Sequence, residues 1–356
     1  MDTVISILIF LIMFTVVVAS HEFGHFLLAK LNGITVLEFS IGMGPTLLHF
    51  TKGGTKYSLK LLPIGGACIF EGENGLEKDE DGKVKEIPEG SFMKAGVWKR
   101  IATVVAGPLF NILLAFVFSL IIVAFCGSDK PVIQDTMEGY PAEEAGILAG
   151  DTLTKINKEN IHIYRQVSLI SALNKGQSLD VEYIRDGKEY KTTITPKYDE
   201  ETGRYYIGIL GAGELIECKG ADLFKYAYYE VNYWFGYTFK ALRMLVGGEL
   251  TKDDVAGPVG MTQQIEETYE AVKPYGFSSV LFTMMSFATL ISVNLGILNL
   301  LPIPALDGGR LLFMLIEVVR GKPIPPEKEG IVHLIGMAAL FALMIFVLFN
   351  DIMRFF

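Results

Sequence analysis

Four long apolar segments constrain the fold of this chain more than any other feature. Each is close to the roughly 20 residues that an α-helix needs to cross a bilayer. The segments are Val4–Leu28, Ile101–Phe125, Val280–Leu301 and Ile331–Phe349. Hydrophobic residues make up 51% of the 356-residue sequence and its mean hydropathy is +0.38, which is too apolar for an ordinary soluble protein. The pattern predicts a multi-pass α-helical protein with four transmembrane helices in a lipid bilayer.

Charged residues and cysteines narrow the class further. Lysines and arginines lie after the first apolar segment, before the second, and between the third and fourth, whereas none precedes the first. Because cytoplasmic flanks of membrane helices are rich in these residues, both termini are predicted to lie outside, with Arg354 as one counter-signal. The net charge of -9 argues against nucleic acid as a partner. The three cysteines, an odd number, are predicted to be free thiols.

A zinc-ligand pattern, His21-Glu22-Phe23-Gly24-His25, lies at the inner end of the first apolar segment. Two histidines four residues apart on a helix differ by only about 40° in azimuth, so both imidazoles can reach one ion. Glu22 can then act on a water molecule at that ion. A chance match in a chain of this length has a frequency on the order of one in a hundred, and ionisable groups at membrane depth tend to be functional. The motif therefore predicts a hydrolytic Zn²⁺ site. Because the first apolar segment contains this motif, it is not predicted to be a removable signal peptide.

The third apolar segment ends in a second motif, Asn299-x-x-Pro302-x-Pro304-x-x-Asp307-Gly308. Its prolines break the helix, and its glycine lets the backbone turn closely past a neighbour. A catalytic zinc needs three protein ligands, and the first motif supplies two, so Asp307 is the candidate third. Both segments are predicted to run inward, which brings the motifs to similar depth toward the cytoplasmic leaflet. The alternative is that Asp307 caps the following helix, which does not exclude metal binding.

The paired motifs resemble those of the site-two intramembrane zinc metalloproteases, specifically the bacterial regulator-of-sigma-E protease group. The resemblance implies that His21, His25 and Asp307 bind Zn²⁺ and that Glu22 is the general acid and base. It further implies that Asn299 holds the substrate or the developing oxyanion. A bacterial inner or plasma membrane location follows, with single-pass membrane proteins as substrates, such as trimmed anti-sigma factors or leftover signal peptides.

Between the first two apolar segments the sequence favours a β-hairpin beside the site. The strands are predicted at Thr46–Phe50 and Tyr57–Leu62, around a Gly53-Gly54 turn. By the family resemblance, an exposed edge of this hairpin adds the unwound substrate backbone as another strand. A hairpin that only packs against the helices is the alternative. The predicted substrate-binding residues are Gly42, Gly44, Tyr57, Ser58, Leu59, Lys60, Pro302 and Pro304.

From about Lys130 to Lys197 the pattern changes to that of a soluble α+β domain. The segment Gly139–Leu153 resembles the signature of a protease-associated PDZ domain, of which one copy is visible. PDZ domains capture extended peptides by strand addition, so this domain is predicted to bind or screen an extracytoplasmic tail. The elements predicted after the signature are a helix at Tyr164–Leu173 and strands at Ser178–Arg185 and Tyr190–Thr195.

The predicted organisation has four parts. Residues 1–126 hold the first two transmembrane helices and the hairpin, 127–213 the PDZ domain, 214–277 an amphipathic interfacial linker, and 278–356 the last two transmembrane helices. A non-proteolytic zinc-binding sensor or scaffold is the alternative function, but a structural zinc site closes its fourth position with protein and does not need Glu22. A transporter with broken helices would show paired repeats, and this sequence shows none.

Overall fold

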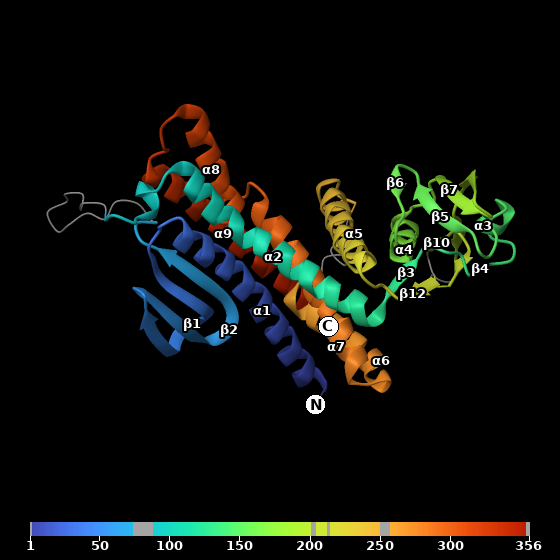
Figure 1. The fold of residues 1–356 in the computed structure, drawn as a ribbon, viewed down its shortest axis with the longest axis horizontal. Coiled ribbons are helices and arrows are strands. Elements are labelled where there is room, and N and C mark those ends of the chain that lie inside the picture. The colour runs from blue at the N-terminus through green and yellow to red at the C-terminus, as the bar shows by residue number, and fades with distance from the viewer. Residues whose placement is uncertain (1, 74–87, 201–203, 212–213, 250–256, 354–356) are drawn as a thin grey trace. The chain divides into compact units, whose positions relative to one another are not determined.

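The computed structural model describes residues 2–73, 88–200, 204–211, 214–249 and 257–353. The chain divides into two compact units (Figure 1). One combines Met1–Phe118 with Thr238–Phe356, and the other is Ser119–Tyr237. The inserted second unit therefore interrupts the first in sequence.

Four helices are long and apolar enough to cross a membrane, as predicted. They are α1 (Asp2–Leu31), α2 (Val97–Cys126), α7 (Phe277–Leu300) and α9 (Pro326–Met353). Each extends the predicted segment by a few residues at one or both ends. Protein covers between 44% of the apolar window of α7 and only 6% of that of α9, which suits helices whose surroundings are lipid.

Shorter helices of the first unit brace these spans. Helix α6 (Pro258–Val272) packs on α1 and α7 through a core of Met13, Ile265, Met284 and Ala288. Asp351 of α9 accepts hydrogen bonds from the main-chain N–H groups at the start of α6. Helix α8 (Asp307–Arg320) is joined to α2 by the buried Arg100–Glu317 ion pair. The remaining elements are α5 (Ala221–Val246) and the 3₁₀ turns η1 (Phe92–Lys94) and η2 (Lys273–Tyr275).

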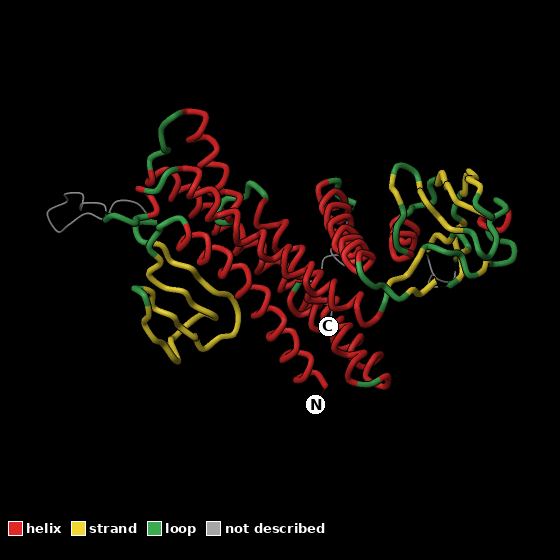
Figure 2. Tube along the Cα trace, in the orientation of Figure 1, coloured by secondary structure: helices red, strands yellow, loops and turns green. Residues whose placement is uncertain are grey.

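The predicted hairpin is present, but its strands are longer than the sequence indicated (Figure 2). Strands β1 (Val36–Lys52) and β2 (Thr55–Phe70) pair twice, because both bend. Residues 46–52 of β1 lie opposite 55–60 of β2, and 38–41 lie opposite both 56–59 and 66–69. The register breaks near Gly42 and Gly44, whose φ angles of 87° and 88° are open to glycine. Residues 57–59 pair with segments of β1 on both sides. Residues 66–70 pair with β1 on one side.

The second unit is an α+β domain, as predicted. Its main sheet has the strand order β6-β5-β7-β8, and α4 (Tyr164–Leu173) has the predicted bounds. A turn at Asp186 and Gly187, with φ angles of 50° and 76°, joins β7 to β8. The core includes Ile133, Leu153 and Val181. The elements are β3 (Ser128–Lys130), β4 (Asp135–Thr136), α3 (Pro141–Glu144), β5 (Thr152–Ile156), β6 (Glu159–Asn160), β7 (Leu179–Arg185), β8 (Lys188–Ile194), β9 (Lys197–Asp199), β10 (Arg204–Tyr206), β11 (Ile209–Leu210) and β12 (Glu214–Ile216).

Candidate metal centre

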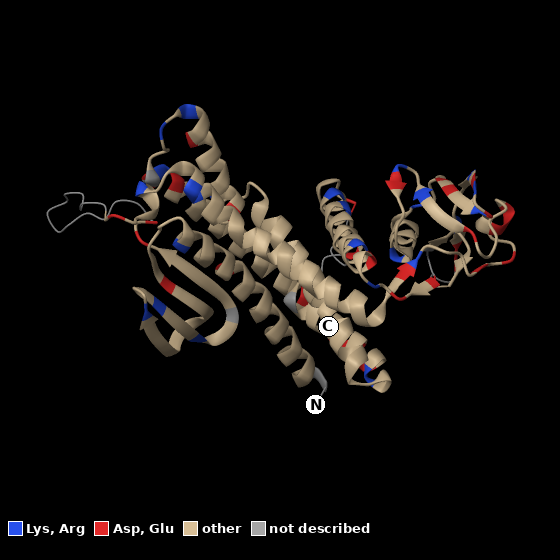
Figure 3. Ribbon diagram, viewed as in Figure 1, with Lys and Arg blue, Asp and Glu red and all other residues tan. Residues whose placement is uncertain are grey.

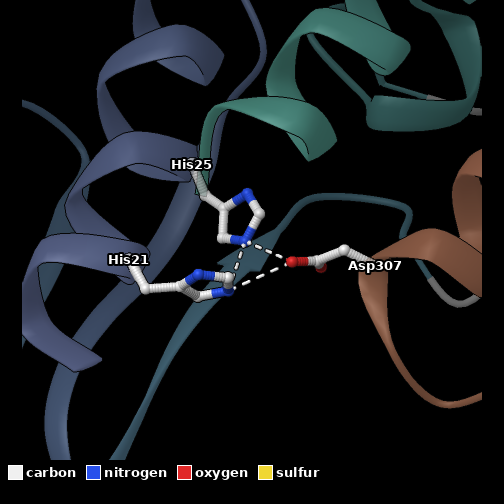
Figure 4. Close-up of side chains that lie close together, drawn as sticks. All are labelled: His21, His25 and Asp307. Carbon is white, nitrogen blue, oxygen red and sulfur yellow. Dashed lines mark hydrogen bonds and ion pairs between the residues drawn. The ribbon is translucent and has the colours of Figure 1, made fainter. Parts of the chain in front are cut away.

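The structure brings together the two histidines of the first motif and the aspartate of the second (Figure 4). His21 and His25 project from the same face of α1, and Asp307 opens α8. Asp307 Oδ2 lies 3.1 Å from His21 Nε2 and 3.4 Å from His25 Nε2, and the two Nε2 atoms are 3.2 Å apart. Both histidines are buried, at 7% exposure each.

The spacing of these three atoms fits a tetrahedral zinc ion. Two ligand atoms about 2.0–2.1 Å from such an ion are about 3.3 Å apart, which matches the observed separations. Asp307 Oδ2 is buried, and within the described part of the chain no hydrogen bond of standard geometry satisfies it. An orphaned carboxylate oxygen facing two imidazole nitrogens is the donor set expected at a zinc centre.

Helix α2 positions both imidazoles. His25 Nδ1 lies 2.9 Å from the Thr103 carbonyl oxygen, which can only accept, so Nδ1 carries the proton and Nε2 is free for a metal. His21 Nδ1 lies 3.3 Å from the Asn111 amide. Gly107 makes the close approach possible, because a Cβ there would lie 2.3 Å from His25 Nε2.

Asp307 is held by the tight turn between α7 and α8. Cβ atoms at Gly308 and Gly309 would lie 2.0 Å from the Leu301 carbonyl oxygen and 2.5 Å from that of Ile303, so these positions suit glycine. Ala305 has a φ of 75°, and its N–H donates to His333 Nδ1 of α9 at 2.8 Å. The N-cap of α8 is Leu306, without a side-chain cap, and Asp307 lies in the first turn. Asp307 is therefore aimed at the histidines and does not cap the helix.

A cavity of about 450 Å³ adjoins the three candidate ligands. Glu22 and Asn299 line it, together with Gly65–Phe70 of β2. The Glu22 carboxyl group is hydrogen-bonded to the main chain of Cys68. Burial raises the pKa of the Cys68 thiol, so the thiol stays neutral.

The predicted substrate-binding residues lie outside this cavity lining. They are Gly42, Gly44, Tyr57, Ser58, Leu59, Lys60, Pro302 and Pro304. Pro304 packs against Gly336 of α9. The cavity is bordered instead by the other end of the hairpin and by Leu295 and Arg310. Arg310 pairs with Glu73, and both also line a neighbouring cavity of about 550 Å³.

Three features beside the candidate ligands were not predicted from the sequence. They are Gly107 and Asn111 of α2 and residues 66–70 of β2. A signal for Asn111 was present, because a lone amide inside an apolar span is costly and tends to have a role. Gly107, four residues earlier, lies on the same helix face. Nothing local distinguishes 66–70 from the other segments of the hairpin.

Fold and site together define an integral membrane protein with a buried metal centre of the hydrolytic type. A model of peptidase family M50 matches residues 9–343. The chain is 33% identical to the zinc metalloprotease RasP of Geobacillus kaustophilus, and the match covers 100% of this chain and 99% of that protein. It is 36% identical to a putative zinc metalloprotease of Clostridium acetobutylicum, over 98% of this chain and 97% of the relative. The regulator of sigma-W protease RasP of Bacillus subtilis is 31% identical, with 99% of each chain covered.

These similarities place the chain plainly: it belongs to peptidase family M50. It is a multi-pass membrane zinc metalloprotease, so the predicted family, enzyme class and cofactor are confirmed. Among solved structures, the PDZ domain of an SdrC-like protein from Listeria monocytogenes is 21% identical, with a TM-score of 0.21. That match covers 23% of this chain and 85% of the other.

Proposed function

We propose that this protease hydrolyses peptide bonds in or beside the transmembrane segments of single-pass membrane proteins. In this proposal His21, His25 and Asp307 hold the Zn²⁺. The observation that carries it is the buried triangle of ligand atoms, 3.1–3.4 Å on a side, beside Glu22, with both histidines on a helix long and apolar enough to cross a membrane. A substrate that reaches this triangle must itself enter the apolar layer.

The proposed chemistry divides between the metal and two side chains. Zn²⁺, when bound, would polarise the scissile carbonyl as a Lewis acid and would lower the pKa of a water molecule so that it loses a proton near neutral pH. Glu22 takes the proton of that water and returns it to the leaving amine. Asn299, which lines the same cavity, donates its amide N–H to the carbonyl oxygen as negative charge develops there.

A transmembrane substrate must unwind before it is cut, because its helical hydrogen bonds shield the carbonyl groups. We place the strand addition at 66–70, because this segment borders the cavity and is paired on one side by the register. The comparison to make is between a photo-crosslinking residue at Ile69 and one at Leu59, which are similarly exposed. Substrate should crosslink at Ile69. Preferential crosslinking at Leu59 would place the added strand at the other end of the hairpin.

Sidedness and substrate class belong to the same proposal. The active site faces the cytoplasmic leaflet of a bacterial plasma membrane, and the PDZ domain lies outside. Basic residues near the loop ends support this orientation, and charge gathers around α8 whereas the spans are largely uncharged (Figure 3). Substrates would be anti-sigma-factor-like proteins and signal peptide remnants. The name of the B. subtilis relative, regulator of sigma-W protease, supports the first class.

The decisive test is Glu22→Gln, which keeps the size of the side chain but removes the base. Purified variant protein should hold zinc as the native protein does and lose cleavage of a model transmembrane substrate by about 10² to 10⁴-fold. Proteomics of membrane fragments from cells with native or Glu22→Gln protein would then identify the natural substrates. Near-native turnover by the zinc-loaded variant would overturn the proposal.

A further inference from the structure

Asn111 is a buried amide whose hydrogen bonding is incomplete. It lies on α2, is 0% exposed, and places its Nδ2 atom 3.3 Å from His21 Nδ1. Within the described residues its Oδ1 atom is buried without a hydrogen-bond partner. An amide in an apolar span is costly when one of its polar atoms stays unsatisfied. The Asn111 amide therefore has an acceptor, Oδ1, that no hydrogen bond uses within the described residues.

Metal binding by His21 would require a hydrogen-bond acceptor beside its Nδ1 atom. His21 Nε2 is the atom that faces Asp307 Oδ2, so it is the nitrogen available to a metal. A neutral imidazole that gives Nε2 to a metal carries its proton on Nδ1, and that N–H needs an acceptor. The Asn111 amide presents a donor there, so two donors would face each other. A half-turn of the amide about its Cβ–Cγ bond exchanges Nδ2 and Oδ1 and supplies the acceptor.

We infer that Asn111 is a positioning residue for zinc binding, whose Oδ1 accepts a hydrogen bond from His21 Nδ1–H when the metal is bound. This inference rests on the proposed ligand set. Both imidazoles would then carry their proton on Nδ1, but the two Nδ1–H groups would donate to different kinds of acceptor. His25 is oriented by the main-chain oxygen of Thr103, which cannot exchange donor for acceptor, whereas His21 is oriented by a side chain that can.

The backbone at Asn111 is fixed, which leaves rotation of the amide as the adjustable feature. Ser292 of α7 donates its hydroxyl to the Asn111 carbonyl oxygen at 2.7 Å, and both residues are fully buried. Ser20 of α1 donates to the neighbouring carbonyl of Phe110 at 3.2 Å. The side chain at position 111 is thus held beside His21 from two directions. The adjustment requires no movement of α2.

The test compares Asn111→Leu, which has no acceptor, with Asn111→Asp, which has two. Competition with a chelator in purified protein should show zinc affinity about 10- to 100-fold weaker for Asn111→Leu, the usual effect of losing such a partner. Asn111→Asp should bind zinc at least as tightly as the native protein. The matched control is Asn294→Leu, which removes another span amide, bonded to Thr238, and should leave zinc affinity unchanged. Equal losses for Asn111→Leu and Asn294→Leu, or native affinity in Asn111→Leu, would overturn the inference.

A spectroscopic readout covers the case in which Asn111→Asp does not fold. The chain has five histidines, so ¹⁵N-histidine spectra of the zinc-loaded protein are tractable. The native protein should show hydrogen-bonded Nδ1–H signals from His21 and His25. Asn111→Leu at saturating zinc should lose only the His21 signal, and its unchanged persistence would overturn the inference. If His21→Ala retains native zinc affinity, the ligand set fails, which is a different result from failure of Asn111 alone.

Discussion

At the scale of single residues, Asp307 is the group that turns two histidines into a three-ligand site. Its Oδ2 is buried between both imidazoles, and it lies in the first turn of α8 without capping the helix. Removing it leaves two neutral nitrogens, too few for a catalytic zinc site.

Asp307→Ala should therefore lower zinc content and proteolysis together, with the fold retained. Metal analysis of the purified variant, paired with a thermal melt in excess chelator for both proteins, separates loss of metal from loss of structure. Asp351→Asn serves as the control, because Asp351 is a buried carboxylate that accepts N–H groups at the start of α6. Undiminished zinc affinity in Asp307→Ala would mean that another residue is the third ligand.

At the scale of elements, the contact between α1 and α2 positions the two imidazoles of the site. Gly24 faces the Ala106 carbonyl, and Gly107 faces both imidazoles, so α1 and α2 approach each other closely at two glycines. Close backbone approach through small residues is a common way to join membrane helices. Here it also brings Thr103 to His25.

Gly107→Ala should consequently weaken zinc binding. The added methyl would lie 2.3 Å from His25 Nε2 and 2.9 Å from His21 Cε1, so an imidazole or α2 must shift. Overpacking typically costs about 1–3 kcal/mol, which corresponds to zinc affinity on the order of 10- to 100-fold lower. Gly96→Ala, where nothing lies within 4 Å of the new methyl, is the matched control. Zinc affinity measured by chelator competition should fall in the first variant only.

A second contact between elements, inside the inserted unit, responds to pH. Glu230 of α5 is 4% exposed and pairs with Arg165 of α4 at 2.5 Å. Burial raises the pKa of Glu230 from 4.5 to about 7, nearby Asp129 adds to this, and Arg165 opposes it. Because the folded state holds this proton more tightly than the unfolded state, Glu230 lowers stability as pH rises from about 4.5 to 7, and no further above that.

Glu230→Gln should therefore flatten the pH dependence of this contact. Hydrogen exchange of α4 amides in the full-length protein, compared at pH 5 and pH 8, should show a larger loss of protection in the native protein than in the variant. Asp129, whose pKa burial also raises, is present in both proteins and changes stability in the same direction in each. Parallel pH responses of the two proteins would exclude Glu230 as the titrating group.

At the scale of the whole molecule, the inserted domain is separable from the metal centre in sequence. Strand β12 pairs with β3, with Glu214 opposite Lys130, so the two ends of the insert lie side by side. A short flexible bridge can therefore replace residues 131–213. The candidate ligands, Glu22 and Asn299 all lie outside the deleted segment.

The deletion should preserve cleavage of a minimal transmembrane peptide and gain cleavage of substrates that carry a bulky outer domain. The physical reason is that the insert is predicted to bind extended tails by strand addition, as PDZ domains do, and it contains none of the candidate ligands. Trimmed and untrimmed forms of one substrate should be assayed side by side at equal zinc occupancy. Unchanged selectivity would rule out the filter, and loss of both activities in a folded, zinc-loaded protein would mean that the insert helps to assemble the site.

Features that depend on a local pattern could be predicted from the sequence. Apolar length fixed the four spans, helical spacing put His21 and His25 on one face, and an Asp-Gly turn between alternating strands fixed β7 and β8. Each of these follows from a period or a length within about 30 residues, which the chain displays directly. Asp307 was predicted as the third ligand because a catalytic zinc needs three protein ligands, and no local pattern shows its contact with the histidines.

The distant residues that complete the site could not be predicted, because their contacts arise when the helices and the hairpin pack together. The tertiary structure brought 66–70 of the hairpin to the cavity where the sequence had favoured 57–60, because a bent strand pairs twice and local propensity is equal along it. It placed Asn111 on His21 and His333 on Ala305. These pairs are 90 and 28 residues apart, and their contacts arise from helix packing, which leaves no periodic trace in the sequence.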